Sequence, residues 1–106
     1  MALKSNEKKA LRVLKEALSP FDIIDLRLFG SKARGTDVEG SDIDVMMVIQ
    51  ERTPQIESTI DDLIFEINLE HDCLISAVYF SVPELDPGPM DQSPIYKRIV
   101  SEGVRL

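Results

Sequence analysis

The sequence predicts one α+β domain, a small mixed β-sheet with helices packed on one of its faces. Its 106 residues are enough for a single hydrophobic core and too few for two. Segments with the two-residue period of strands alternate with segments that have the helical period of 3.6 residues. The connections between them allow antiparallel and parallel pairing in one sheet. We therefore expect residues 1–106 to form a single domain.

The first two elements are a helix and a strand. Residues 6–18 have apolar side chains at spacings of three and four, and the helix should stop at Ser19 because Pro20 disfavours the helical conformation before it. Residues 22–29 alternate between apolar and charged side chains, which predicts a strand that ends at Gly30.

The rest of the chain adds two strands and two helices. Residues 42–49 predict the second strand, and Thr53 with Pro54 has the pattern of a helix start. That helix carries an apolar stripe, and a third strand follows at residues 73–80. We expect a proline-rich loop around Pro83, Pro87 and Pro89 and a last helix over residues 93–102.

Connection lengths predict how the strands pair. The segment between the first two strands is short for a parallel crossover, so these strands should be antiparallel. A whole helix joins the second and third strands, which should therefore be parallel. The end of the first strand and the starts of the other two then meet at one edge of the sheet. This arrangement brings Gly30 and Ser31 close to Asp42 and Asp44, with Asp72 nearby.

Composition restricts the classes of ligand. Hydrophobic residues make up 43% of the chain, which argues against disorder, and no apolar run approaches the roughly 18 residues that span a bilayer. With no signal-peptide pattern at the start, we expect a cytoplasmic protein that does not enter membranes. A single cysteine, Cys73, excludes an internal disulfide, and with the single His71 it excludes a Cys/His zinc site. A bound metal would need oxygen ligands.

The negative charge lies in the middle of the chain. Residues 36–72 contain eleven acidic residues and one basic residue, whereas residues 1–35 contain four acidic and eight basic residues. Such an acidic centre repels nucleic acid and attracts divalent cations or a basic protein partner. We therefore expect no nucleic-acid ligand, although a solvated acidic helix face accounts for part of the excess.

Asp42 and Asp44 are the clearest candidates for metal ligands. They lie two residues apart on a strand, so both side chains point to the same face. Two such charges about 4 Å apart repel each other by about 4 kcal/mol at an effective dielectric constant near 20. Mg²⁺ would relieve this repulsion, above all when a polyphosphate is also bound. The alternative is that both aspartates are exposed residues at the start of a strand.

Gly30 and Ser31 are candidates for phosphate binding. A glycine at the end of a strand lets the backbone approach a ligand closely, and the serine adds a hydroxyl donor. A Gly-Ser pair after a strand is by itself common in turns. Its predicted position beside the two aspartates makes a site for a nucleotide with its metal.

These residues resemble a known signature. Gly30-Ser31-Lys32-Ala33-Arg34-Gly35 followed by Ser41-Asp42-Ile43-Asp44-Val45 is similar to the Gly-Ser-x-Ala-Arg-Gly and Ser-Asp-Ile-Asp motifs of the DNA polymerase beta-like nucleotidyltransferases, in particular the minimal ones. The resemblance covers residues 22–50 and implies the palm-like fold of that superfamily. It implies that Gly30, Ser31, Arg34 and Ser41 bind a nucleoside triphosphate, ATP being expected, and that Asp42 and Asp44 hold Mg²⁺ and are catalytic. Arg34 could instead brace its own loop through hydrogen bonds.

The third carboxylate of such sites has no obvious equivalent. Family members usually carry it on the strand after the helix, and on that strand Asp72, Leu74 and Ser76 of this chain are expected to share one face. Asp72 could serve as a catalytic residue if the strand register places it at the edge, and otherwise Ser76 occupies the position. A serine is a poor general base and a weak ligand for magnesium.

The resemblance implies transfer of a nucleoside monophosphate to a hydroxyl acceptor. In related minimal members the acceptor is a small helical partner protein encoded nearby, and the nucleotidyltransferase is the antitoxin of a toxin–antitoxin pair. The alternative is a weakly active or inactive module of the same fold that neutralises a partner by binding it. A sugar- or antibiotic-modifying enzyme is a third reading, which the small size opposes. Met46 and Val48 share the face of the aspartates, and either the last helix or a second subunit could cover them; an apolar patch of that kind would favour a homodimer.

Overall fold

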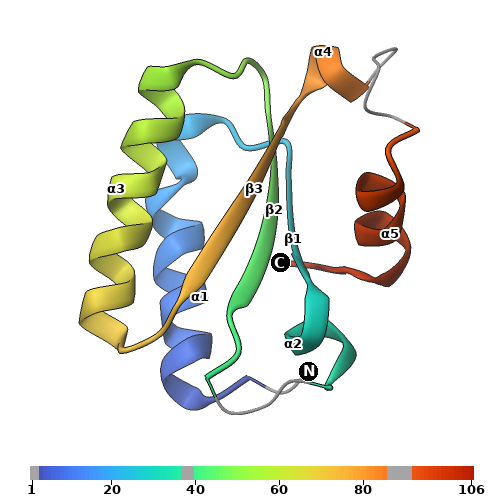
Figure 1. Ribbon diagram of the computed structural model, residues 1–106. Helices are drawn as coiled ribbons and strands as arrows, with labels where there is room; N and C mark the ends of the chain where they lie inside the picture. Colours follow the sequence, from blue (N-terminus) through green and yellow to red (C-terminus); the bar gives the residue numbers. More distant parts are fainter. Residues whose placement is uncertain (1–2, 37–39, 86–91) are drawn as a thin grey trace.

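The computed structural model describes residues 3–36, 40–85 and 92–106. A four-stranded sheet with the order β3-β2-β1-β4 lies between α1 and α3 on one face and α5 on the other, as Figure 1 shows. The elements run in the order α1 Ser5–Ala17, η1 Ser19–Phe21, β1 Asp25–Phe29, α2 Gly30–Arg34, β2 Ile43–Ile49, α3 Pro54–His71, β3 Ile75–Ser81, α4 Val82–Leu85, α5 Pro94–Glu102 and β4 Val104–Arg105.

The strand pairing confirms the predicted topology. β1 is antiparallel to β2, and β2 is parallel to β3 through the connection that contains α3. The register pairs Asp44 with Phe29 on one side and with Ser76 on the other, so these residues form one row across the sheet. The sheet is therefore mixed, and the α+β class predicted from the sequence is correct. The helices were predicted on one face of the sheet only, whereas α5 packs on the other face because Met46 and Val48 make that face apolar too.

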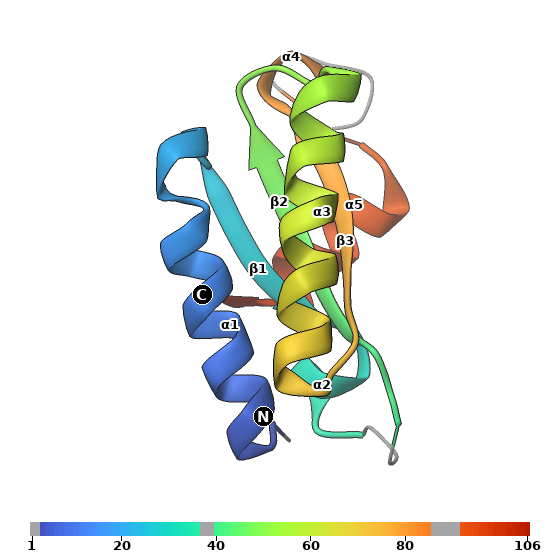
Figure 2. The same ribbon diagram turned by 90° about the vertical axis from the view of Figure 1, so that its left-hand side faces the viewer.

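Helix α3 begins and ends where side chains satisfy its backbone. The Thr53 hydroxyl accepts a hydrogen bond from the backbone N–H of Ile56, as expected for the predicted N-cap. At the other end, the amide of Asn6 in α1 donates to the carbonyl oxygens of His71 and Asp72. Figure 2 shows the two helices side by side and antiparallel, so this contact joins the first turn of α1 to the last turn of α3.

Two apolar clusters bury the two faces of the sheet. The larger one packs the buried sides of α1 and α3 against alternate residues of β2, including Val45 and Met47. The smaller one packs Met46 and Val48 against Ile99 of α5. Met46 and Val48 are thus covered by the last helix, which is one of the two alternatives that the sequence left open, and they form no exposed apolar patch that would favour a homodimer.

Several boundaries differ from the sequence prediction. The first strand begins at Asp25, because Asp22 has a left-handed conformation that turns the chain before it. Pro83 lies in the short helix α4, although the sequence predicted a loop there, while Pro87 and Pro89 lie outside the described residues. The two-residue strand β4 was not predicted, because its pairing with β1 has no local signal. Within the described ranges, no helix is long and apolar enough to cross a membrane.

Candidate functional site

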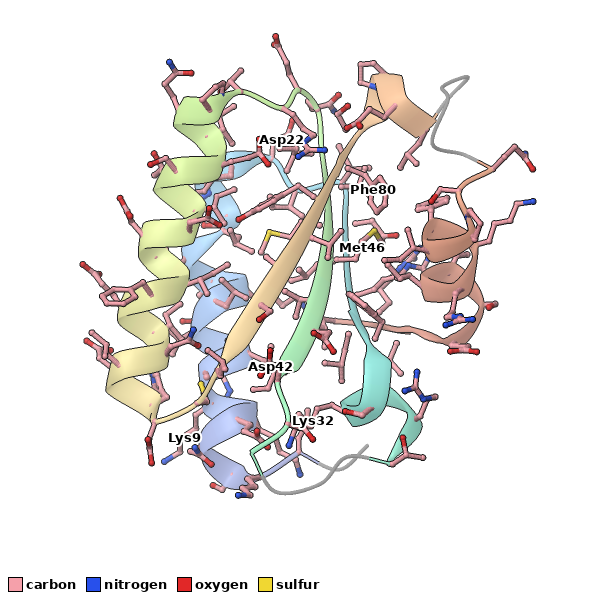
Figure 3. All side chains as sticks on the ribbon, in the orientation of Figure 1. Lys9, Asp22, Lys32, Asp42, Met46 and Phe80 are labelled. Atoms are coloured by element: carbon pink, nitrogen blue, oxygen red, sulfur yellow. The ribbon has the colours of Figure 1, made fainter. Side chains whose placement is uncertain are left out.

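The candidate site lies at the edge of the sheet where β1 ends and β2 begins. Asp44 is the second residue of β2, and Asp42 directly precedes that strand. Asp44 alternates along β2 with Met46 and Val48, which pack against α5, so its side chain points to the same face of the sheet. Asp42 is exposed and Asp44 is partly buried. Figure 3 labels Asp42 near the lower end of β2, with α2 beside it. The structure therefore brings together the two aspartates and the Gly30 turn, as the sequence predicted.

Gly30 allows the chain to pass directly against Asp44. Its φ angle of 74° is in the left-handed region, and a Cβ atom at this position would lie 2.4 Å from Oδ2 of Asp44. The backbone conformation therefore favours glycine, and any side chain here would displace the carboxylate of Asp44. Ser31 follows as the second residue of α2, so it directly continues the turn that packs against Asp44.

The electrostatics of Asp44 fit a cation site. Partial burial raises the pKa of this carboxyl above its usual range, the negative charge of Asp42 raises it further, and the positive charge of Arg34 opposes the shift. Such a shift means that the charged form is disfavoured in the protein alone. A cation bound between Asp42 and Asp44 would remove this penalty, so the two carboxylates suit a hard divalent ion such as Mg²⁺.

Ser76, and not Asp72, stands beside the aspartate pair. Ser76 pairs with Asp44 in the register of β2 and β3, and its hydroxyl donates a hydrogen bond to Oδ2 of Asp42 at 3.3 Å. Asp72 is the C-cap of α3, in a left-handed conformation with a φ angle of 51°, and β3 begins three residues later. The prediction that residue 72 could share a strand face with Ser76 is therefore wrong. The residues that the structure describes contain no group of three or more His, Cys, Asp or Glu side chains that could hold a metal ion.

Arg34 and Ser41 border the site on two sides. The Arg34 guanidinium is half exposed and forms an ion pair with Glu102 of α5 at 3.7 Å. It is close enough to Asp44 to lower the pKa of that carboxyl, so it faces both α5 and the aspartates. Ser41 lines a hollow of about 280 Å³ on the side of α1, and Asp72 lines the same hollow.

One feature of the site was missed by sequence reasoning. Lys32, in the middle of α2, is only 2% exposed and pairs with Glu7 of α1. A lysine after a Gly-Ser pair suggests an exposed side chain that could meet phosphate, and nothing in the local sequence indicates its burial. The burial of Lys32 could be predicted only together with Glu7. Glu7 occupies the N3 position of α1, where its carboxylate also accepts a hydrogen bond from the backbone N–H of Lys4.

Comparison with known proteins identifies the family. The nucleotidyltransferase domain family matches residues 7–102, and the chain belongs to this family. No curated protein matches the sequence significantly. The motif residues that suggested the family from the sequence lie within the matched range.

Solved structures with the same fold include proteins of this class. A structure assigned to the minimal nucleotidyltransferases has a TM-score of 0.63 at 17% identity, and the match covers 100% of both chains. A toxin–antitoxin structure with AMP-PNP has a TM-score of 0.63 at 18% identity, covering 92% of this chain and 70% of that one. A mutant of the toxin–antitoxin complex MntA–HpeT has a TM-score of 0.59 at 20% identity, covering 97% and 72%. These likenesses show that the fold is shared.

Proposed function

We propose that the chain transfers a nucleoside monophosphate from a nucleoside triphosphate, with ATP as the expected donor, to a hydroxyl group of a partner protein. The observation that carries this proposal is the close contact between the Gly30 turn and Asp44, next to the exposed Asp42 at the start of β2. A phosphate-binding turn packed against two cation ligands is what a metal-bound triphosphate requires.

The residues of the site have separate roles in this proposal. Gly30 and Ser31 contact the triphosphate, Arg34 and Ser41 add polar contacts at its sides, and Asp42 with Asp44 holds Mg²⁺. The metal ion, when bound, supplies positive charge that offsets the charge on the phosphate oxygens. The acceptor oxygen forms a bond to the α-phosphorus as the bond between the α-phosphorus and the oxygen bridging to the β-phosphate breaks. Pyrophosphate leaves with that oxygen, and the proton of the acceptor hydroxyl passes to solvent water.

Two observations support a protein as the acceptor. Structures of the same fold include toxin–antitoxin complexes, one of them with AMP-PNP, which favours a nucleotide and a protein partner for this chain as well. In addition, α3 carries five acidic residues and no lysine or arginine, which disfavours nucleic acid and favours a basic protein surface. We therefore propose an antitoxin role, with a small helical protein encoded nearby as the acceptor.

Nucleotide binding can be tested by calorimetry with Mg²⁺ and the α,β-methylene analogue of ATP, which cannot transfer its nucleotide. We expect the wild-type protein to bind it and the Asp42→Asn/Asp44→Asn double variant to lose magnesium-dependent binding, because the variant has no carboxylate for the ion. Asp62→Asn is the matched control, since this exposed aspartate lies on α3, on the opposite face of the sheet. Unchanged affinity in the double variant would rule out the assignment of the metal ligands.

Transfer can be tested with labelled ATP, Mg²⁺ and the protein encoded by the neighbouring gene. Label in the α-phosphate should appear on the partner protein, whereas label in the γ-phosphate should leave with pyrophosphate. Labelling of the partner from the γ-position would show a different reaction and refute the proposed one.

Ser76 favours a second candidate function, a module of this fold that binds and neutralises its partner with little or no catalysis. Its hydroxyl occupies the position beside Asp42 where a third carboxylate would assist the reaction. The Ser76→Asp variant separates the two functions. A large rise in transfer with unchanged partner affinity would mean that the natural site is weakened and that binding is its main role. Transfer that is already efficient in the wild type, and no faster in the variant, would refute this second function.

A further inference from the structure

Glu7 and Lys32 form a buried ion pair between two separate elements. Among the described residues, these two are the buried charged side chains, at 6% and 2% exposed. The Lys32 ammonium lies 3.1 Å from Oε2 of Glu7 and 3.2 Å from Oε1. Figure 3 labels Lys32 below the end of the sheet, where its side chain lies between α2 and the first turn of α1.

Stability alone does not account for this pair. Removing two charges from water costs more than burying two apolar side chains of the same size, and apolar replacements of buried pairs are often neutral or stabilising. The pair instead fixes the position of the Lys32 side chain, because both oxygens of one carboxylate hold its ammonium. Glu7 is itself fixed, since its Oε1 accepts a hydrogen bond of 2.8 Å from the backbone N–H of Lys4.

The position that the pair defines is that of the turn beside the aspartates. Lys32 directly follows Ser31, and the backbone of Gly30 packs against the carboxylate of Asp44. At the other end of α2, the ion pair of Arg34 is half exposed and contributes little to holding the helix. The buried end of Lys32 is therefore the main polar anchor of α2 on the rest of the protein.

We propose that Glu7 and Lys32 are positioning residues that act through Ser31, an inference that rests on the proposed function. Neither contacts the nucleotide. They hold α2 so that the turn at Gly30 and Ser31 stays at a fixed distance from Asp42 and Asp44. A displacement of about 1 Å at a reacting group can reduce the rate by about 100-fold, so small movements of this turn matter.

The test replaces the pair with apolar side chains of similar size in the double variant Glu7→Leu/Lys32→Met. We expect this variant to fold with a thermal midpoint equal to or above that of the wild type, because no buried charge is left unpaired. We expect its affinity for the magnesium complex of the α,β-methylene ATP analogue to fall by about 10- to 100-fold, since the turn is no longer held in place. The matched control is Lys8→Met, which removes an exposed charge from the same turn of α1 and should change neither quantity.

Three results would overturn the inference. A stable double variant with wild-type nucleotide affinity would show that the pair is only structural. Equal loss of affinity in the Lys8→Met control would show that the effect is not specific to the buried pair. If the double variant does not fold, the Lys32→Met variant replaces it, because it removes the ammonium while Glu7 keeps its hydrogen bond from the backbone N–H of Lys4, and wild-type affinity there has the same meaning. A wild-type protein that binds no nucleotide would refute the proposed function itself.

Discussion

Replacing Gly30 with alanine should damage the site more than the fold. An alanine at this position must adopt a φ angle near 74°, which costs an L-residue about 1 to 2 kcal/mol. Its Cβ would also lie 2.4 Å from Oδ2 of Asp44, 3.3 Å from Cγ and 3.5 Å from Cβ. The carboxylate of Asp44 can rotate away from the added methyl group, so the further loss of stability from this contact should be small. The rotation would nevertheless move the carboxylate out of its place beside Asp42.

Gly35 provides a matched control for this prediction. Its φ angle of 73° carries the same conformational penalty, and no atom of the described residues lies within 4 Å of the Cβ that alanine would add. Both variants should therefore lose about 1 to 2 kcal/mol, a fall in thermal midpoint of about 5 to 10 °C for a domain of this size. Only Gly30→Ala should weaken binding of the magnesium nucleotide complex, by about tenfold or more, measured by calorimetry. Equal binding losses in the two variants would refute the proposed contact with Asp44.

Two further predictions concern pH and the start of β3. Because burial and the Asp42 charge raise the pKa of Asp44 from 3.8, the folded protein holds this proton at higher pH than the unfolded chain does, and stability falls as pH rises through that interval. Asp44→Asn should therefore be more stable than the wild type at pH 7 and equally stable near pH 3 in thermal unfolding without metal. A less stable variant at pH 7 would contradict the raised pKa. Asn68→Ala should lose about 1 to 3 kcal/mol in urea unfolding, since the Asn68 amide bonds both the N–H (2.8 Å) and the carbonyl (3.2 Å) of Ile75. A loss below about 0.5 kcal/mol would show that water replaces these bonds.

Most of the fold follows from local patterns in the sequence. The apolar spacing of α1 and α3, the cap at Thr53 and the alternation in β1 each depend on neighbours a few residues away, so they are visible without a structure. The connection lengths then predicted the mixed pairing, because the segment between β1 and β2 is too short for the crossover that parallel strands need, whereas the segment with α3 is long enough. The same reasoning placed Gly30 and Ser31 near Asp42 and Asp44.

The tertiary structure decided the features that depend on contacts between distant segments. Strand periodicity alone allowed Asp72 or Ser76 to face the aspartates, and the choice depends on where α3 ends and how Asn68 holds the start of β3. The burial of Lys32 required a carboxylate from α1, 25 residues away in the sequence. The pattern of each segment determines which of its faces is apolar, whereas the partner of a charged side chain is known only once the segments have packed.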